Sequence, residues 1–103
     1  MEDYIYYGEL YDLYQQLLTD KQRAYFEDYY FQNLSLGEMA ENYQVSRNAI
    51  FKQLHIVTDK LKEYEEKLQL LEKRKQLEEI SQSIDNLDIK KKLEELIDRK
   101  SVV

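Results

Sequence analysis

The amino-acid sequence predicts an all-α protein, and three of its features support that class. The 103 residues include no proline and only two glycines, Gly8 and Gly37, which disfavours hairpins and tight turns. Apolar residues recur at spacings of three and four, the period of a helix with one buried face. Residues that favour helix caps interrupt this pattern. We expect a helical bundle over residues 1–64 and a helical extension over residues 65–103.

The first two helices are expected over about residues 3–18 and 20–31. Leucines and tyrosines give the first helix a broad apolar face. Thr19 and Gln22 have the spacing of a capping box, in which two side chains bind free backbone N–H groups at a helix start. The inward or half-buried positions of the second helix are expected to be Ala24, Tyr25, Tyr29 and Tyr30.

A short third helix and a turn are expected next. Ser35 and Glu38 repeat the capping-box spacing, and the helix should end at about Asn42. The turn follows at residues 43–45, and Ser46 can cap a fourth helix by accepting a hydrogen bond from a free backbone N–H group.

The fourth helix is expected to be long, over about residues 47–80, because no breaker follows Ser46. Its apolar residues repeat every 3.5 positions, which is typical of a coiled-coil seam. The seam residues are Ile50, Leu54, Val57, Leu61, Tyr64, Leu68 and Leu71. A break is expected at residues 81–86, and Asp88 is the candidate cap of a last helix.

The outer part of this seam predicts an additional partner. Leu68 and Leu71 lie about 25–30 Å along the helix from Ile50, at 1.5 Å per residue, so the bundle should not reach them. They should then pair with the terminal helix or with another chain. We expect a homodimer, with residues 65–103 as a candidate coiled-coil or dimerisation segment.

Residues 35–54 have the pattern of a helix-turn-helix. Ala40 supplies the small residue that two crossing helices need. Apolar residues to hold the crossing are Leu36, Met39, Val45 and Ile50. The second helix of such a unit keeps its first turns exposed for a groove or a partner.

The expected contact residues lie on that second helix, and they are Ser46, Arg47, Asn48, Phe51, Lys52 and His55. Arginine can pair with guanine or phosphate, asparagine with adenine, and lysine with phosphate. Backbone N–H groups at the Ser46 end can hold a phosphate. The alternative interpretation of these residues is a solvated polar face on an ordinary helix.

The helix-turn-helix region resembles the promoter-reading C-terminal domain of bacterial sigma factors, and it is still more similar to the YlxM family of small bacterial proteins. The matching segments are Leu18-Thr19, Gln22-Arg23, Tyr29-Tyr30, Leu34 to Ala40, Val45 to Ile50, and Leu61 to Leu68. The resemblance covers about residues 1–72 and implies a winged-helix-like or sigma C-terminal-domain-like bundle followed by a long helix. Because genes of the family commonly neighbour that of the signal recognition particle GTPase, it also implies a regulatory or accessory role in that pathway.

Two residues depart from the sigma-type pattern. Gln44 stands where a glycine is usual, so the turn must tolerate a less favourable backbone conformation if its left-handed residue is at this position. Phe51 places an exposed aromatic ring at a contact position, where it can meet a thymine methyl group, a base face or a protein partner.

Composition and charge exclude several classes of function. Without cysteine, and with His55 as the one histidine, the chain offers no thiol chemistry and no ready metal site. We expect no catalysis, no cofactor, no membrane segment and a cytoplasmic location. The net charge is -6, but residues 34–62 carry +1, so the least acidic stretch holds the helix-turn-helix.

The sequence leaves three functions open. The first is a helix-turn-helix factor of the signal recognition particle pathway that contacts DNA or RNA through the helix beginning after Ser46. The second is a protein-interaction adaptor without nucleic-acid binding, which the overall acidity favours. The third is a dimeric DNA-binding transcription regulator, which needs its two recognition helices about 34 Å apart.

Overall fold

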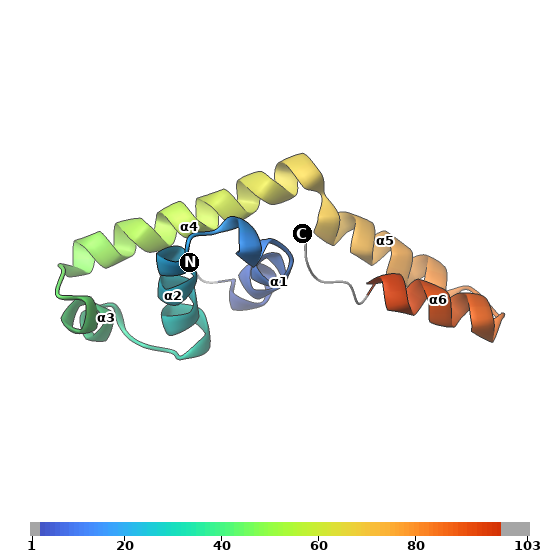
Figure 1. Ribbon diagram of the computed structural model, residues 1–103, viewed down its shortest axis with the longest axis horizontal. Helices are drawn as coiled ribbons and strands as arrows, with labels where there is room; N and C mark the ends of the chain where they lie inside the picture. Colours follow the sequence, from blue (N-terminus) through green and yellow to red (C-terminus); the bar gives the residue numbers. More distant parts are fainter. Residues whose placement is uncertain (1–2, 98–103) are drawn as a thin grey trace.

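The computed structural model describes residues 3–97, and this part of the chain contains helices and no strand (Figure 1). The all-α class is therefore confirmed, and no β-wing accompanies the helix-turn-helix within these residues. The last six residues of the predicted extension, 98–103, lie outside the described range. The elements are α1 (Tyr4–Tyr14), a 3₁₀ turn η1 (Gln15–Leu17), α2 (Asp20–Phe26), a π-helical turn η2 (Glu27–Phe31), α3 (Leu36–Tyr43), α4 (Arg47–Leu68), α5 (Leu70–Gln82) and α6 (Leu87–Ile97).

Side-chain caps mark the starts of α2 and α3 where the sequence predicts them. The Thr19 hydroxyl accepts a hydrogen bond from the Gln22 backbone N–H at 3.1 Å, and the Gln22 side chain accepts from the Thr19 N–H at 3.0 Å. Ser35 and Glu38 form the second capping box, with both distances at 3.0 Å. Both predicted capping boxes are confirmed. They fix where α2 and α3 start.

The bundle core lies between α1, α2 and the middle of α4. The core contains buried tyrosines as well as leucines, among them Tyr11, Tyr14 and Tyr30. Tyr11 stacks on Phe26, with ring centroids 4.4 Å apart. The expectation that the tyrosines serve packing is confirmed for these positions.

The prediction of one helix over residues 47–80 is wrong. The helix ends at Leu68, and Gln69 adopts a left-handed conformation with φ 55° and ψ 35° before α5 begins. The bend returns Leu71 to the bundle core, where 2% of it is exposed. The expectation that the bundle cannot reach Leu71 is therefore also wrong, whereas Leu68 remains 40% exposed.

The two last helices form a hairpin, with α6 packed against α5. The helical structure is interrupted between Gln82 and Leu87, within the region where the sequence predicts a break. The predicted cap, Asp88, is two residues too late. Instead, the Asn86 side-chain oxygen accepts hydrogen bonds from the backbone N–H groups of Asp88 at 2.9 Å and Ile89 at 3.2 Å.

The molecule is elongated, with extents of 55 × 25 × 23 Å. The α3 helix and the first turns of α4 lie at one end of the long axis, and the α5–α6 hairpin lies at the other (Figure 1). The helix-turn-helix is thus held on one end of the bundle by α4, which also packs on α1 and α2.

Candidate nucleic-acid interface

The turn of the helix-turn-helix depends on Gln44, which adopts the left-handed conformation with φ 57° and ψ 46°. This conformation costs a non-glycine residue about 1 kcal/mol. Two backbone hydrogen bonds close the end of α3: the Gln44 N–H donates to the Glu41 carbonyl at 3.3 Å, and the Val45 N–H donates to the Ala40 carbonyl at 3.0 Å. These two bonds stabilise the turn, which forms without the glycine that is usual there.

A small separate core fixes the crossing of α3 and α4. Met39, Ile50 and Leu54 are fully buried and pack together with Tyr25 of α2. Tyr43, at the end of α3, meets the Tyr25 ring edge-on at 4.5 Å and donates a hydrogen bond to the Asp28 carboxylate. Burial and this hydrogen bond raise the pKa of Tyr43 to about 12, so its hydroxyl remains a donor at neutral pH.

The structure brings the six predicted contact residues to the first turns of α4, and all of them are exposed. Ser46 caps the helix by accepting a hydrogen bond from the Ala49 backbone N–H at 3.1 Å. Asn48, Lys52 and His55 project from the side of α4 opposite the buried Ile50. We call Asn48, Phe51, Lys52 and His55 the α4 face.

The α4 face includes an aromatic pair. The Phe51 and His55 rings meet edge to face, with centroids 4.5 Å apart and an interplanar angle of 71°. Phe51 is 42% exposed, and Ile56, which the sequence did not single out, is exposed to the same extent. This end of α4 therefore offers ring and aliphatic surface as well as polar groups.

The Arg47 side chain does not project along the α4 face. Its guanidinium lies over the first turn of α3, at the backbone of Gly37. A Cβ atom placed on Gly37 would be 3.0 Å from Arg47 Nη2 and 3.2 Å from Nε. The sequence placed Arg47 among the expected contact residues but gave no sign of this contact with Gly37.

Acidic groups border the interface. Glu38 and Glu41 are exposed on α3, and Asp59 is exposed on α4 one turn beyond His55. Hydrogen bonds with Ser35 lower the pKa of Glu38, so this carboxylate is charged at neutral pH. The region suited to phosphate is therefore confined to the start of α4, around Arg47 and Lys52.

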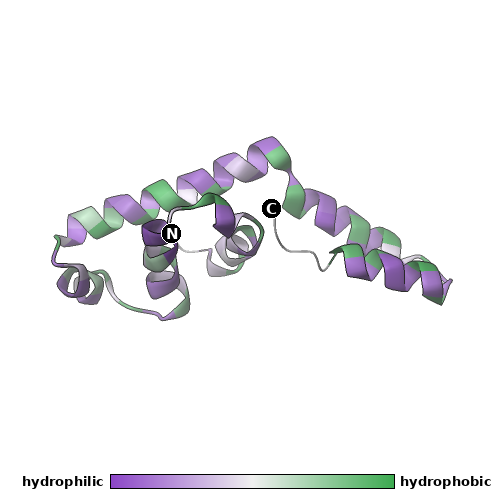
Figure 2. Ribbon diagram, in the orientation of Figure 1, coloured by the Kyte–Doolittle hydropathy of each residue, from purple (hydrophilic) through white to green (hydrophobic). Residues whose placement is uncertain are grey.

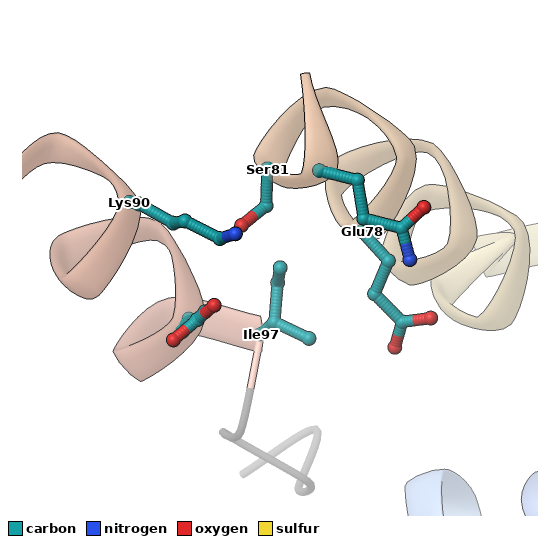
Figure 3. A pocket seen from close by; sticks show the side chains of 6 residues that line it. Glu78, Ser81, Lys90 and Ile97 are labelled. Atoms are coloured by element: carbon teal, nitrogen blue, oxygen red, sulfur yellow. The ribbon is translucent and has the colours of Figure 1, made fainter. Parts of the chain in front are cut away.

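Elsewhere, a pocket of about 300 Å³ lies between α5 and α6. The side chains of Lys90 and Ser81 point toward each other across it, with Glu78 and Ile97 on its walls (Figure 3). Within residues 3–97, no group of three or more His, Cys, Asp or Glu side chains is placed to hold a metal ion. The pocket shows no pairing of a nucleophile with a histidine base, so we assign it no chemistry.

No helix among the described residues combines the length and the apolar character needed to cross a membrane.

Comparison with known proteins identifies the family. Residues 1–100 match the family UPF0122, described as "Putative helix-turn-helix protein, YlxM / p13 like". A UPF0122 protein of Shouchella clausii is 44% identical over 94 residues, covering 87% of this chain and 86% of that protein. One from Listeria welshimeri is 45% identical over 76 residues, covering 74% and 69%, and one from Bacillus cereus is 53% identical over 64 residues, covering 62% and 58%. On these matches and on its helix-turn-helix, the chain belongs to the YlxM / p13-like UPF0122 family.

Proposed function

We propose that this protein is a non-catalytic helix-turn-helix factor that contacts nucleic acid through the start of α4 and serves the signal recognition particle pathway as a regulatory or accessory component. The observation that carries the nucleic-acid part is the exposed, capped start of α4, which presents Arg47, Asn48 and Lys52 at one end of the molecule. These side chains are suited to phosphates and base edges. The link to the pathway rests on the resemblance to the YlxM family and its gene neighbourhood.

Fluorescence anisotropy against signal recognition particle RNA and a random DNA duplex, over a salt series, tests the proposal. The wild-type protein should bind with an affinity that falls steeply as salt rises. The double variant Arg47→Glu with Lys52→Glu should bind roughly 10- to 100-fold more weakly, because two phosphate contacts become repulsive. Preference between the two probes separates an RNA-linked role from transcription.

The matched control reverses two exposed charges on α5, with Lys73→Glu and Lys75→Glu. It makes the same change in net charge but should leave the affinity within about twofold of wild type, since α5 lies away from the interface. Equal weakening by the two double variants would show that only overall charge matters. Flat titrations of the wild-type protein at low salt would reject nucleic-acid binding itself.

A protein-interaction adaptor is the second candidate function. The exposed Phe51 and Ile56 and the net charge of -6 favour a protein surface over a phosphate backbone as the partner. Flat RNA and DNA titrations combined with saturable binding to the purified signal recognition particle GTPase would establish it. In that case the charge reversals at Arg47 and Lys52 should leave partner binding largely unchanged.

We also propose that the protein forms a homodimer through the α5–α6 hairpin. Its exposed apolar residues are Ile80, Leu87, Ile89 and Leu96, and each is more than half exposed. Solvent contact with large apolar side chains is unfavourable, and a second copy of the same hairpin would cover them. A transcription regulator that reads a palindromic site would in addition need its two α4 helices about 34 Å apart.

A further inference from the structure

The contact between Gly37 and Arg47 joins the first turns of the two helices that make the helix-turn-helix. A Cβ atom at Gly37 would meet Arg47 Nη2 at 3.0 Å, Nε at 3.2 Å and Cζ at 3.3 Å, all closer than ordinary van der Waals contact. A side chain at residue 37 would therefore push the guanidinium away by at least a few tenths of an ångström. We call this contact between the α3 backbone at Gly37 and the Arg47 guanidinium the seat.

The seated guanidinium has unused hydrogen-bonding capacity. Within residues 3–97, the Arg47 side chain makes no hydrogen bond and no ion pair, although its guanidinium has five N–H donors. Glu38, which follows Gly37 in the chain, directs its carboxylate to the Ser35 N–H at 3.0 Å. The guanidinium is exposed beside the α3 backbone, so its donors are available to an anion.

The position of the seat indicates which part of a nucleic acid it meets. In helix-turn-helix complexes the first helix crosses the sugar-phosphate backbone, while the second lies in the groove. The guanidinium lies over the first helix, α3, whereas the α4 face projects from the second. We infer that Gly37 positions Arg47 as a contact to a backbone phosphate, leaving Asn48 for the groove. This inference rests on the proposed function.

The variant Gly37→Ala tests the seat. The backbone of Gly37 has no positive φ, so alanine fits it, and the crowded atoms belong to the free end of a long side chain that can move away. We expect a melting temperature equal to or above that of wild type, because alanine favours helices more than glycine does. The affinity for RNA and for random duplex should nevertheless fall roughly three- to tenfold on both probes, and the log–log salt slope should fall by about 0.9.

Two further variants isolate the role of Arg47. Gly8→Ala is the matched control, because a Cβ atom at Gly8 meets nothing within 4 Å, and it should leave binding unchanged. In an Arg47→Ala background, Gly37→Ala should cause no additional loss, since the side chain that it displaces is already gone.

Three outcomes distinguish the role of the seat from nucleic-acid binding itself. Weaker binding by Gly37→Ala that disappears in the Arg47→Ala background supports the seat. Wild-type binding that Gly37→Ala leaves unchanged overturns the seat and preserves the proposed function. No binding by the wild-type protein rejects both.

Discussion

At the scale of single residues, Tyr14 and Glu65 account for the bend between α4 and α5. The fully buried Tyr14 donates a hydrogen bond from its hydroxyl to Glu65 Oε1 at 2.6 Å, and the same hydroxyl accepts from the Leu70 N–H at 3.0 Å. Glu65 also accepts from the backbone N–H groups of Leu71 at 3.0 Å and Glu72 at 3.2 Å. These groups satisfy the first N–H donors of α5, which Gln69 leaves without a side-chain cap.

This network predicts a measurable coupling. Glu65→Gln and Tyr14→Phe should each lower the free energy of unfolding by about 1–2 kcal/mol, because each leaves a partly buried N–H or oxygen without its partner. Together they should cost less than the sum of the two, since each removes the bond between them. Urea denaturation of the two single variants and the double variant measures this coupling.

The control for this cycle is Tyr64→Phe, which removes a weaker hydrogen bond of 3.3 Å from the Tyr64 hydroxyl to the Leu17 carbonyl. It should cost under about 1 kcal/mol. Strictly additive losses for Tyr14 and Glu65 would mean that the two residues do not act as one cap.

At the scale of elements, the starts of α2, α3 and α4 were predictable because they depend on local signals. Thr19 with Gln22, and Ser35 with Glu38, act within four residues of sequence, and both capping boxes form. The bend at Gln69 was not predictable in this way. Glutamine is no signal for a left-handed residue, and Tyr14, one of the two residues that stabilise the bend, is far away in the sequence.

In the candidate site too, some features follow from local sequence and others depend on tertiary packing. The exposure of Asn48, Lys52 and His55 follows from the helical period, which places them opposite Ile50. The position of the Arg47 guanidinium depends on how α3 crosses α4, which periodicity does not contain. The contact roles of these residues remain a prediction.

At the scale of the whole molecule, the two exposed surfaces lie at opposite ends. The start of α4 is at one end of the 55 Å axis, and the α5–α6 hairpin is at the other. Apolar residues recur among hydrophilic ones along both helices of the hairpin (Figure 2). A dimer made through the hairpin therefore leaves both α4 faces free.

Light scattering tests the dimer. The wild-type protein should have twice the mass of one chain at micromolar concentration, and the double variant Ile89→Lys with Leu96→Lys should be a monomer, because two charges would enter the apolar contact. Ile5→Lys, a change at a 79% exposed position on α1, is the control and should remain a dimer. A monomeric wild-type protein at this concentration would reject the dimer without affecting the site on α4.

Contact between nucleic acid and the start of α4 can be observed residue by residue in an NMR titration of the ¹⁵N-labelled protein with signal recognition particle RNA. We expect the backbone amide resonances of residues 46–55 and of Gly37 to shift, while those of α5 and α6 do not. Shift changes confined to α5 and α6, or no changes at all, would contradict this expectation.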